Sequence, residues 1–241
     1  MKRLLATMKL DVLVQIRTNL YQIGLSASVW IAAILAWLAT PEQLGALIPT
    51  VMLLIVGGST LLYVAALIIF EKDEGTLNAA IVSPLLPAEY LWSKIVTLTG
   101  LAALESTVMF GGAMGLMWYF KSVVWPNVPI LYVGIVAIGV LYTLVGIILV
   151  VRYDKITDFL VPMSVVAVVL QLPFIYFLEW VTHPLLLLIP TSGPGMIMRG
   201  AYVSLSVGEW VYALGYTTVL IVGLTVWAQK AFQTHVVLKV G

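Results

Sequence analysis

Long apolar stretches separated by short polar connections make up most of the chain. A helix needs about 20 apolar residues to cross the ~30 Å hydrocarbon core of a bilayer, and six stretches have about that length or more. They predict membrane-spanning helices at residues 21–39, 44–70, 91–120, 128–151, 156–180 and 210–228. The predicted fold class is therefore an all-α integral membrane protein with six transmembrane helices, in a single transmembrane domain covering residues 1–241.

Residues 1–20, ahead of the first span, mix apolar and polar positions instead of forming a continuous apolar run. On a helical projection the apolar side chains gather on one side and the charged side chains lie mostly on the other. The apolar side consists of Leu4, Leu5, Met8, Val12, Ile16 and Leu20, and the charged residues are Lys2, Arg3, Lys9, Asp11 and Arg17. The pattern predicts an amphipathic helix lying in the membrane interface. A basic flank that only orients the first span explains the same residues equally well.

The lysines and arginines set the orientation of the six spans. Basic residues near helix ends are retained in the cytoplasm. With a cytoplasmic N-terminus, Lys121 and Arg199 are the only two of the 12 lysines and arginines that fall on the outer side. The charge distribution therefore predicts that both termini are cytoplasmic.

Composition agrees with a membrane protein and narrows the choice of partners. Hydrophobic residues make up 62% and charged residues 10% of the 241 residues, with a mean hydropathy of +1.09, whereas soluble domains are about 25% charged. No room remains for a separate soluble domain. The formal net charge of +1 gives no indication of a nucleic-acid partner, and we expect none.

The sequence contains no pattern for catalysis or metal binding. There is no cysteine, and His183 and His235 are too far apart in the sequence to predict a metal site. Residues 57–60 contain two glycines but no lysine and lie inside a predicted span, so they cannot hold the phosphates of a nucleotide. We therefore expect no enzymatic activity, no metal and no cofactor in this chain.

The most polar passage, residues 71–90, follows the second predicted span. Its charged run at residues 71–74 cannot stay in hydrocarbon, where a central charge costs about 2.5–3.5 kcal/mol or more. Thr76 can cap a short helix over residues 75–82, and Pro84 ends it because proline disfavours helical geometry in the residue before it. A helix this short is marginal in water, so it needs the bilayer, its own protein or a partner to pack on. A solvated acidic loop explains the charges but not the bounded helix.

This order of residues resembles the permease subunits of type-2 ATP-binding cassette exporters. In that family an acidic run, a Gly-Thr pair, a short apolar helix and Ser/Thr-Pro follow the second span, and a lysine enters the third. The matching residues here are Glu71, Glu74, Gly75, Thr76, Leu77, Ser83, Pro84 and Lys94. The resemblance implies that this segment is a coupling helix that seats in a groove of a cytosolic ATPase subunit, which binds the ATP and magnesium.

The same resemblance implies further features of the protein. It predicts a dimer of permeases, either a homodimer or a paralogous heterodimer. The complex is expected to sit in a prokaryotic plasma (inner) membrane and to export a hydrophobic or amphipathic substrate such as a drug or lipid.

Residues 181–208, between the last two spans, are too apolar for an ordinary loop and too short and proline-broken to cross. They predict two short helices, at residues 185–189 and 196–202, that dip back into the outer leaflet against the bundle. By the family resemblance, Pro184, Pro190 and Arg199 fall at the expected places of paired re-entrant helices.

Glu105 is the ionisable exception within the third predicted span. It lies 11 residues beyond Lys94, or about 16 Å at 1.5 Å per residue, near the membrane midplane. An ionisable residue at that depth is a functional candidate, which contacts substrate or cycles its protonation. It can equally be a neutral carboxyl bonded to a neighbouring helix; the candidate partners are Ser106, Thr107 and Tyr142.

Three functions therefore stay open. The first is the membrane subunit of an ATP-driven exporter. The second is a proton-coupled secondary carrier that uses Glu105. The third is a membrane assembly protein that transports nothing.

Overall fold

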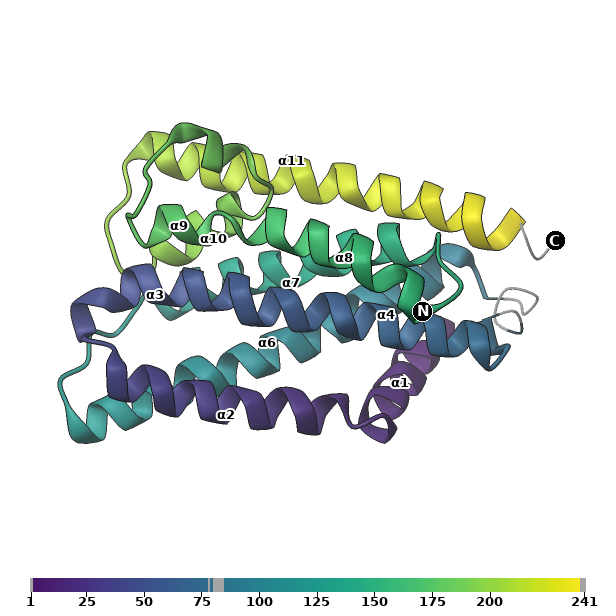
Figure 1. The fold of residues 1–241 in the computed structure, drawn as a ribbon, viewed down its shortest axis with the longest axis horizontal. Coiled ribbons are helices and arrows are strands. Elements are labelled where there is room, and N and C mark those ends of the chain that lie inside the picture. The colour runs from purple at the N-terminus through teal and green to yellow at the C-terminus, as the bar shows by residue number, and fades with distance from the viewer. Residues whose placement is uncertain (1, 78, 80–84, 239–241) are drawn as a thin grey trace.

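The computed structural model describes residues 2–77, 79 and 85–238. Figure 1 shows long helices lying side by side, with α1 (Lys2–Arg17) crossing them near one end. The first and last described residues, the end of α4 (Gly57–Asp73) and the start of α6 (Pro87–Phe120) lie toward that end. We call it the basic end, after Lys72 of α4 and Lys94 of α6. No strand occurs in the described part of the chain. The predicted all-α fold class is confirmed.

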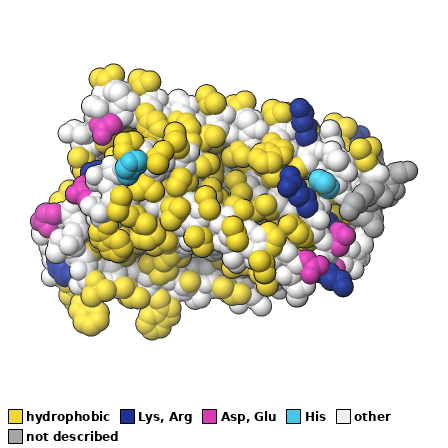
Figure 2. Space-filling view, turned by 45° about the horizontal axis from the view of Figure 1, so that its top comes forward, with side chains coloured by type: hydrophobic (Ala, Val, Ile, Leu, Met, Phe, Trp, Pro, Cys, Tyr) yellow, Lys and Arg dark blue, Asp and Glu magenta, His cyan; other side chains and the backbone are white. Residues whose placement is uncertain are grey.

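Six helical segments are long and apolar enough to cross a membrane, as predicted. They are Leu20–Leu38, Pro41–Asp73, Pro87–Phe120, Val128–Val150, Ile156–Phe177 and Val207–Val237. The space-filling view in Figure 2 agrees, because hydrophobic side chains form a broad band across the visible face and charged side chains gather toward its two ends. The third span begins four residues earlier than predicted, the second and sixth spans begin three residues earlier, and the sixth ends nine residues later.

Local capping explains the early starts of the third and sixth spans. The third span, α6, begins with Pro87, and the Glu89 carboxylate accepts a hydrogen bond from the Leu86 N–H at 3.1 Å. The sixth span, α11 (Val207–Phe232), begins after Ser206, whose N–H donates to Glu209 at 2.7 Å. Both motifs satisfy backbone donors that a helix leaves unpaired at its start. Polar residues therefore extend these helices beyond the apolar stretch.

The second span is continuous but not uniform. It consists of the short 3₁₀ helix η1 (Pro41–Gln43), α3 (Leu44–Val51), the π-helical turn η2 (Met52–Val56) and α4. Side chains of two neighbouring helices bond to this turn. The Tyr142 hydroxyl donates to the Leu53 carbonyl at 3.2 Å, and the Gln171 amide donates to the Leu54 carbonyl at 3.1 Å. Tyr142 lies on α7 (Val128–Val150), and Gln171 lies on α8 (Ile156–Gln171).

The segment between the last two spans forms two short helices, as predicted, with shifted bounds. After α9 (Phe174–Phe177), they are the 3₁₀ helix η3 (Pro184–Leu188) and α10 (Ser192–Arg199). Pro184 begins η3, Pro190 separates the two helices, and Arg199 ends α10 and pairs with Glu179 at 2.9 Å. Their depth in the membrane stays a prediction.

Close packing holds α10 against α7, α11 and α3. Gly134 of α7 makes this possible, because a Cβ atom there would lie 2.3 Å from Met198 Cγ and 3.1 Å from the Pro194 carbonyl oxygen. Both contacts come from α10, and the second is backbone, which cannot turn aside. The absence of a side chain at Gly134 therefore sets the distance between the two helices.

We expect Gly134→Val to lower the free energy of unfolding by about 1–3 kcal/mol, since an overpacked contact must displace α10. Thermal unfolding in detergent, followed by tryptophan fluorescence, measures this. Gly215→Val on α11 is the control, because a Cβ atom there meets nothing within 4 Å. Equal melting temperatures for the two variants would contradict the packing argument.

Candidate functional site

A buried cluster of charges joins three helices at the basic end. Lys94 of α6 is 0% exposed, and its ammonium donates to Asp11 Oδ1 at 2.6 Å and to Glu71 Oε1. Asp11 lies on α1 and Glu71 on α4. The other carboxylate oxygens are also engaged, because Ser93 donates to Asp11 Oδ2 and Tyr90 donates to Glu71 Oε2, each at 2.5 Å. We call these five residues the Lys94 cluster.

The cost of burying these charges makes the cluster a strong constraint on how α1, α4 and α6 pack together. Each buried ion loses several kcal/mol of hydration, which only excellent geometry and further hydrogen bonds offset. Here every carboxylate oxygen has a partner, and the Tyr90 ring centroid lies 5.1 Å from the ammonium of Lys94. Tyr90 also stacks on Phe232 of α11, with 5.1 Å between ring centroids. The basic ends of four helices are thus linked through one lysine and its neighbours.

The cluster explains why α1 does not turn its predicted apolar face inward. Asp11 is 2% and Gln15 0% exposed, and the Gln15 amide donates to Thr97 of α6 at 3.1 Å. Leu5 and Ile16, on the predicted apolar side of this interfacial helix, are 62% and 49% exposed. The predicted helix is confirmed, but the placement of Asp11 on its outward face is wrong, because pairing with Lys94 draws Asp11 toward the bundle.

The predicted coupling segment begins directly beside this cluster. The chain turns at Gly75, whose φ of 71° suits glycine, and residues 76, 77 and 79 are helical. The Thr76 hydroxyl donates to the Glu71 carbonyl at 3.2 Å, while Glu74 and Thr76 are exposed. Leu77 is buried in the protein's own core. Ser83, Pro84 and half of the predicted helix at residues 75–82, namely 78 and 80–82, lie outside the described residues.

A hollow of about 410 Å³ opens between α1, α4 and the start of α6. The carboxylates of Glu71 and Glu74 line it together with apolar side chains such as Leu10 and Phe70. Such a lining suits a basic or apolar side chain of a partner, because it offers negative charge and apolar walls.

Glu105, the second predicted site, is enclosed between α2 (Leu20–Leu38), α4 and α6. It is 2% exposed, and Ser59 donates to its Oε2 at 3.1 Å. Its Oε1 has no hydrogen-bond partner within the described residues. The carboxyl group fits because residue 24 is glycine: a Cβ atom there would lie 1.7 Å from Glu105 Oε1 and 2.8 Å from the Tyr63 hydroxyl. Its role in a substrate pathway stays a prediction.

The bonding partners expected for Glu105 are wrong. Ser106 donates to the Ala102 carbonyl at 2.7 Å, and Thr107 bonds to Tyr132. Tyr142 donates to Leu53 of the π-helical turn, as described above. Ser59 takes the predicted place, and no sequence pattern distinguished it from the other hydroxyls of the spans.

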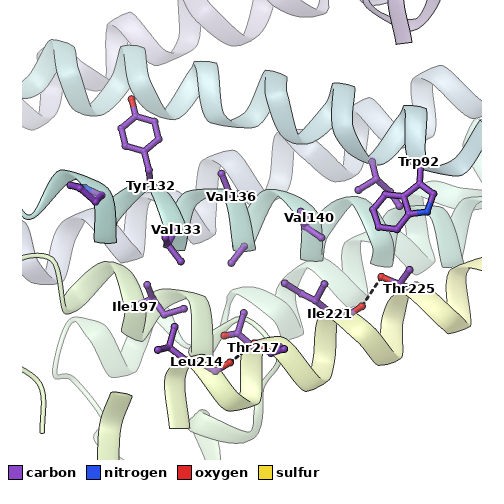
Figure 3. Close-up of a pocket in the computed structure, with 14 residues that line it drawn as sticks. Trp92, Tyr132, Val133, Val136, Val140, Ile197, Leu214, Thr217, Ile221 and Thr225 are labelled. Carbon is purple, nitrogen blue, oxygen red and sulfur yellow. Dashed lines mark hydrogen bonds between the residues drawn. The ribbon is translucent and has the colours of Figure 1, made fainter. Parts of the chain in front are cut away.

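An apolar groove of about 570 Å³ lies between α7 and α11, with α6 and α10 at its sides (Figure 3). Valine, isoleucine and leucine supply half of its 14 lining residues, and Trp92 and Tyr132 lie toward opposite ends of it. Thr218 and Thr225 donate to carbonyls of their own helix, each at 2.7 Å. Among the described residues, no charged side chain lines the groove. It therefore suits an apolar group better than an ionised one.

Comparison with known proteins agrees with this architecture. The model of the fluoroquinolones export permease protein family matches residues 2–240. Two proteins of Mycobacterium tuberculosis, from strains CDC 1551 / Oshkosh and ATCC 25618 / H37Rv, are each 28% identical over 251 aligned residues. The alignments cover 100% of this chain and 99% of each relative, and both relatives are named fluoroquinolones export permease protein. The predicted resemblance to exporter permeases is confirmed, as is the multi-pass plasma-membrane location.

Removing the charge of Lys94 alone should be severe. We expect Lys94→Met to lower the free energy of unfolding by about 3–5 kcal/mol, because two carboxylates stay buried without their cation. Adding Asp11→Asn and Glu71→Gln to that variant should restore most of the loss. Thermal unfolding in detergent gives both values.

The matched control is Arg199→Met, which breaks the exposed pair with Glu179. It should cost no more than about 1 kcal/mol. A Lys94→Met variant as stable as this control would mean that the cluster is not a constraint on the fold.

Proposed function

The chain belongs to the fluoroquinolones export permease protein family, and we propose that it is the membrane-spanning subunit of an ATP-driven exporter. A permease without its own nucleotide-binding loop needs an external source of energy. In this proposal a cytosolic ATP-binding cassette subunit binds and hydrolyses ATP with magnesium. Two permease protomers, identical or paralogous, each face one ATPase.

The proposed substrate is a hydrophobic or amphipathic molecule that leaves the cytoplasm or the inner leaflet. The names of the relatives support aromatic antibacterial compounds of the fluoroquinolone type as one such class. The groove between α7 and α11 supports it too, because its apolar wall suits the aromatic part of such a molecule. The charged part of the same molecule needs an oppositely charged partner, and no charged residue of the described part of the chain lines this groove.

The Lys94 cluster is the observation that carries the coupling proposal. A force on the segment after α4 reaches α6 through the ion pair of Glu71 with Lys94, and reaches α1 through Asp11. The next residue, Lys72, donates to the Tyr153 carbonyl at 2.6 Å beyond the end of α7. The consecutive residues Glu71 and Lys72 thus bond the end of α4 to α6 and to the segment that follows α7. ATPase closure against this segment would move the basic ends of the spans together.

The predicted coupling residues differ in how exposed they are. Glu74 is exposed at the hollow, whereas Leu77 is buried and Glu71 is held by Lys94 and Tyr90. Alanine at Glu71 or Leu77 would therefore disturb the permease itself. We propose that Glu74 contacts the ATPase directly and that Glu71 transmits the movement.

Glu74→Lys should abolish stimulation of the ATPase and weaken its binding about 30-fold, as for a charge reversed at the centre of an interface. The measurement is co-purification and ATP hydrolysis with the nucleotide-binding subunit encoded nearest the permease gene. Asp158→Lys is the control, since Asp158 is an exposed acid in the first turn of α8 and has no ion-pair partner within the described residues. If both variants stimulated the ATPase like the unchanged protein, residue 74 would not be part of the contact.

A proton-coupled secondary carrier is the second candidate, and the buried Glu105 carboxyl favours it. One of its oxygens has no partner within the described residues, so a proton or a substrate donor can occupy that position. In this scheme the protein works without an ATPase, and protonation of Glu105 accompanies each transport cycle.

Liposomes that contain only this chain distinguish the two candidates. A carrier should move a fluorescent fluoroquinolone when a pH gradient is imposed. Glu105→Gln should abolish that movement because an amide cannot cycle a proton. Glu42→Gln, at an exposed glutamate of η1, should leave it unchanged. An absence of pH-driven movement, together with ATP-driven movement once the ATPase is added, excludes the carrier.

A further inference from the structure

A second groove, of about 530 Å³, lies between α1, the start of α2 and α6. It is separate from the groove between α7 and α11, and the two share no lining residue. Its wall consists of Met8, Lys9, Val12, Leu13, Tyr21, Val96, Thr97, Gly100 and Leu104. Neither the coupling proposal nor the carrier scheme uses this groove.

The α6 side of the groove is an apolar strip. Val96, Gly100 and Leu104 lie on successive turns and span about 12 Å of helix. Val96 and Leu104 are 44% and 40% exposed, and a Cβ atom at Gly100 would meet nothing within 4 Å. The nearby Thr97 hydroxyl is already satisfied, because it donates to the Ser93 carbonyl at 2.9 Å and accepts from Gln15. The strip has the length and chemistry to hold part of an acyl chain.

The α1 side adds one positive charge. Lys9 lines the groove, no carboxylate does, and within the described residues Lys9 has no ion-pair partner. The nearest acid in the sequence, Asp11, is turned to the opposite side of α1 and is held by Lys94. The outward face of α1 around Lys9 carries the exposed apolar side chains of Leu5, Leu13 and Ile16. An ammonium thus stands where an apolar strip meets the membrane surface.

We propose that this groove binds one anionic phospholipid of the inner leaflet. One acyl chain lies along Val96, Gly100 and Leu104, and the phosphate lies beside the Lys9 ammonium. The predicted topology places α1 at the cytoplasmic surface, where anionic lipids attract basic residues. The apolar strip and the unpaired cation together favour an anionic lipid over an apolar partner helix, because such a helix needs no cation.

Bound lipid gives α1 a second attachment. The Lys94 cluster holds one side of α1 through Asp11, and the lipid fills the gap to α6 on the other side. Lipid in this position would fix the angle at which α1 crosses the bundle, independently of any ATPase.

Native mass spectrometry tests the proposal on the full chain, after purification with equal amounts of phosphatidylglycerol and phosphatidylcholine of the same acyl chains. The unchanged protein should retain one phosphatidylglycerol in preference to phosphatidylcholine. Gly100→Phe should release lipid of both kinds, because a Cβ atom at residue 100 meets nothing within 4 Å and the ring would fill the groove that the position lines. Lys9→Gln should lower the preference for phosphatidylglycerol about fivefold while keeping a lipid in place.

Two matched variants separate this site from general effects. Gly223→Phe adds the same ring at an open glycine of α11, and Arg17→Gln removes an exposed charge of α1 that does not line the groove. Both should retain phosphatidylglycerol like the unchanged protein. Unaltered lipid retention in Gly100→Phe, or an unaltered preference in Lys9→Gln, would overturn the proposal. A Gly100→Phe variant that keeps its lipid but no longer forms a dimer would also overturn the proposal, because a second copy of the chain would then occupy the groove.

Discussion

A buried ammonium group needs negative charge nearby to offset its lost hydration, and the Lys94 ammonium pairs with carboxylates from two other helices, Asp11 of α1 and Glu71 of α4. Asp11 and Glu71 are 60 residues apart in the chain, and both reach the same nitrogen atom. Neither helix can slide or rotate far without leaving a buried charge unpaired, which costs more than most packing changes. The arrangement of the basic end follows from this demand: α1 crosses the bundle where Asp11 can reach Lys94, and α4 ends where Glu71 can.

The sequence predicts those parts of the fold that depend on length and local chemistry. Six apolar stretches correspond to six spans, and the chain turns at Gly75, at the start of the short helix predicted for residues 75–82. Periodicity did not predict which side of α1 faces the bundle. It places Asp11 on the charged side of the helix and takes no account of its pairing with a lysine 83 positions later. A lone acid between Leu10 and Val12 in an interfacial helix was the available signal, together with a lysine at the edge of a span.

For Glu105, too, the sequence predicts one property and not another. Its depth followed from counting residues, and its burial confirms that it is no surface group. Its partner could not be predicted, because the choice among hydroxyls depends on which helix lies opposite and how closely it approaches. Gly24 decides this distance, and a glycine in an apolar span gives no warning of a carboxyl group beside it.

The π-helical turn at Met52–Val56 divides the second span into two rods with a joint between them. A wide turn shifts the helix out of its usual hydrogen-bond register, and here Tyr142 and Gln171 fasten two of its carbonyls to α7 and α8. The two halves of the second span are therefore not joined by one uniform helix. At the joint the span is also tied to α7 and α8, so a load on α4 would be borne by these two helices as well as by its own backbone.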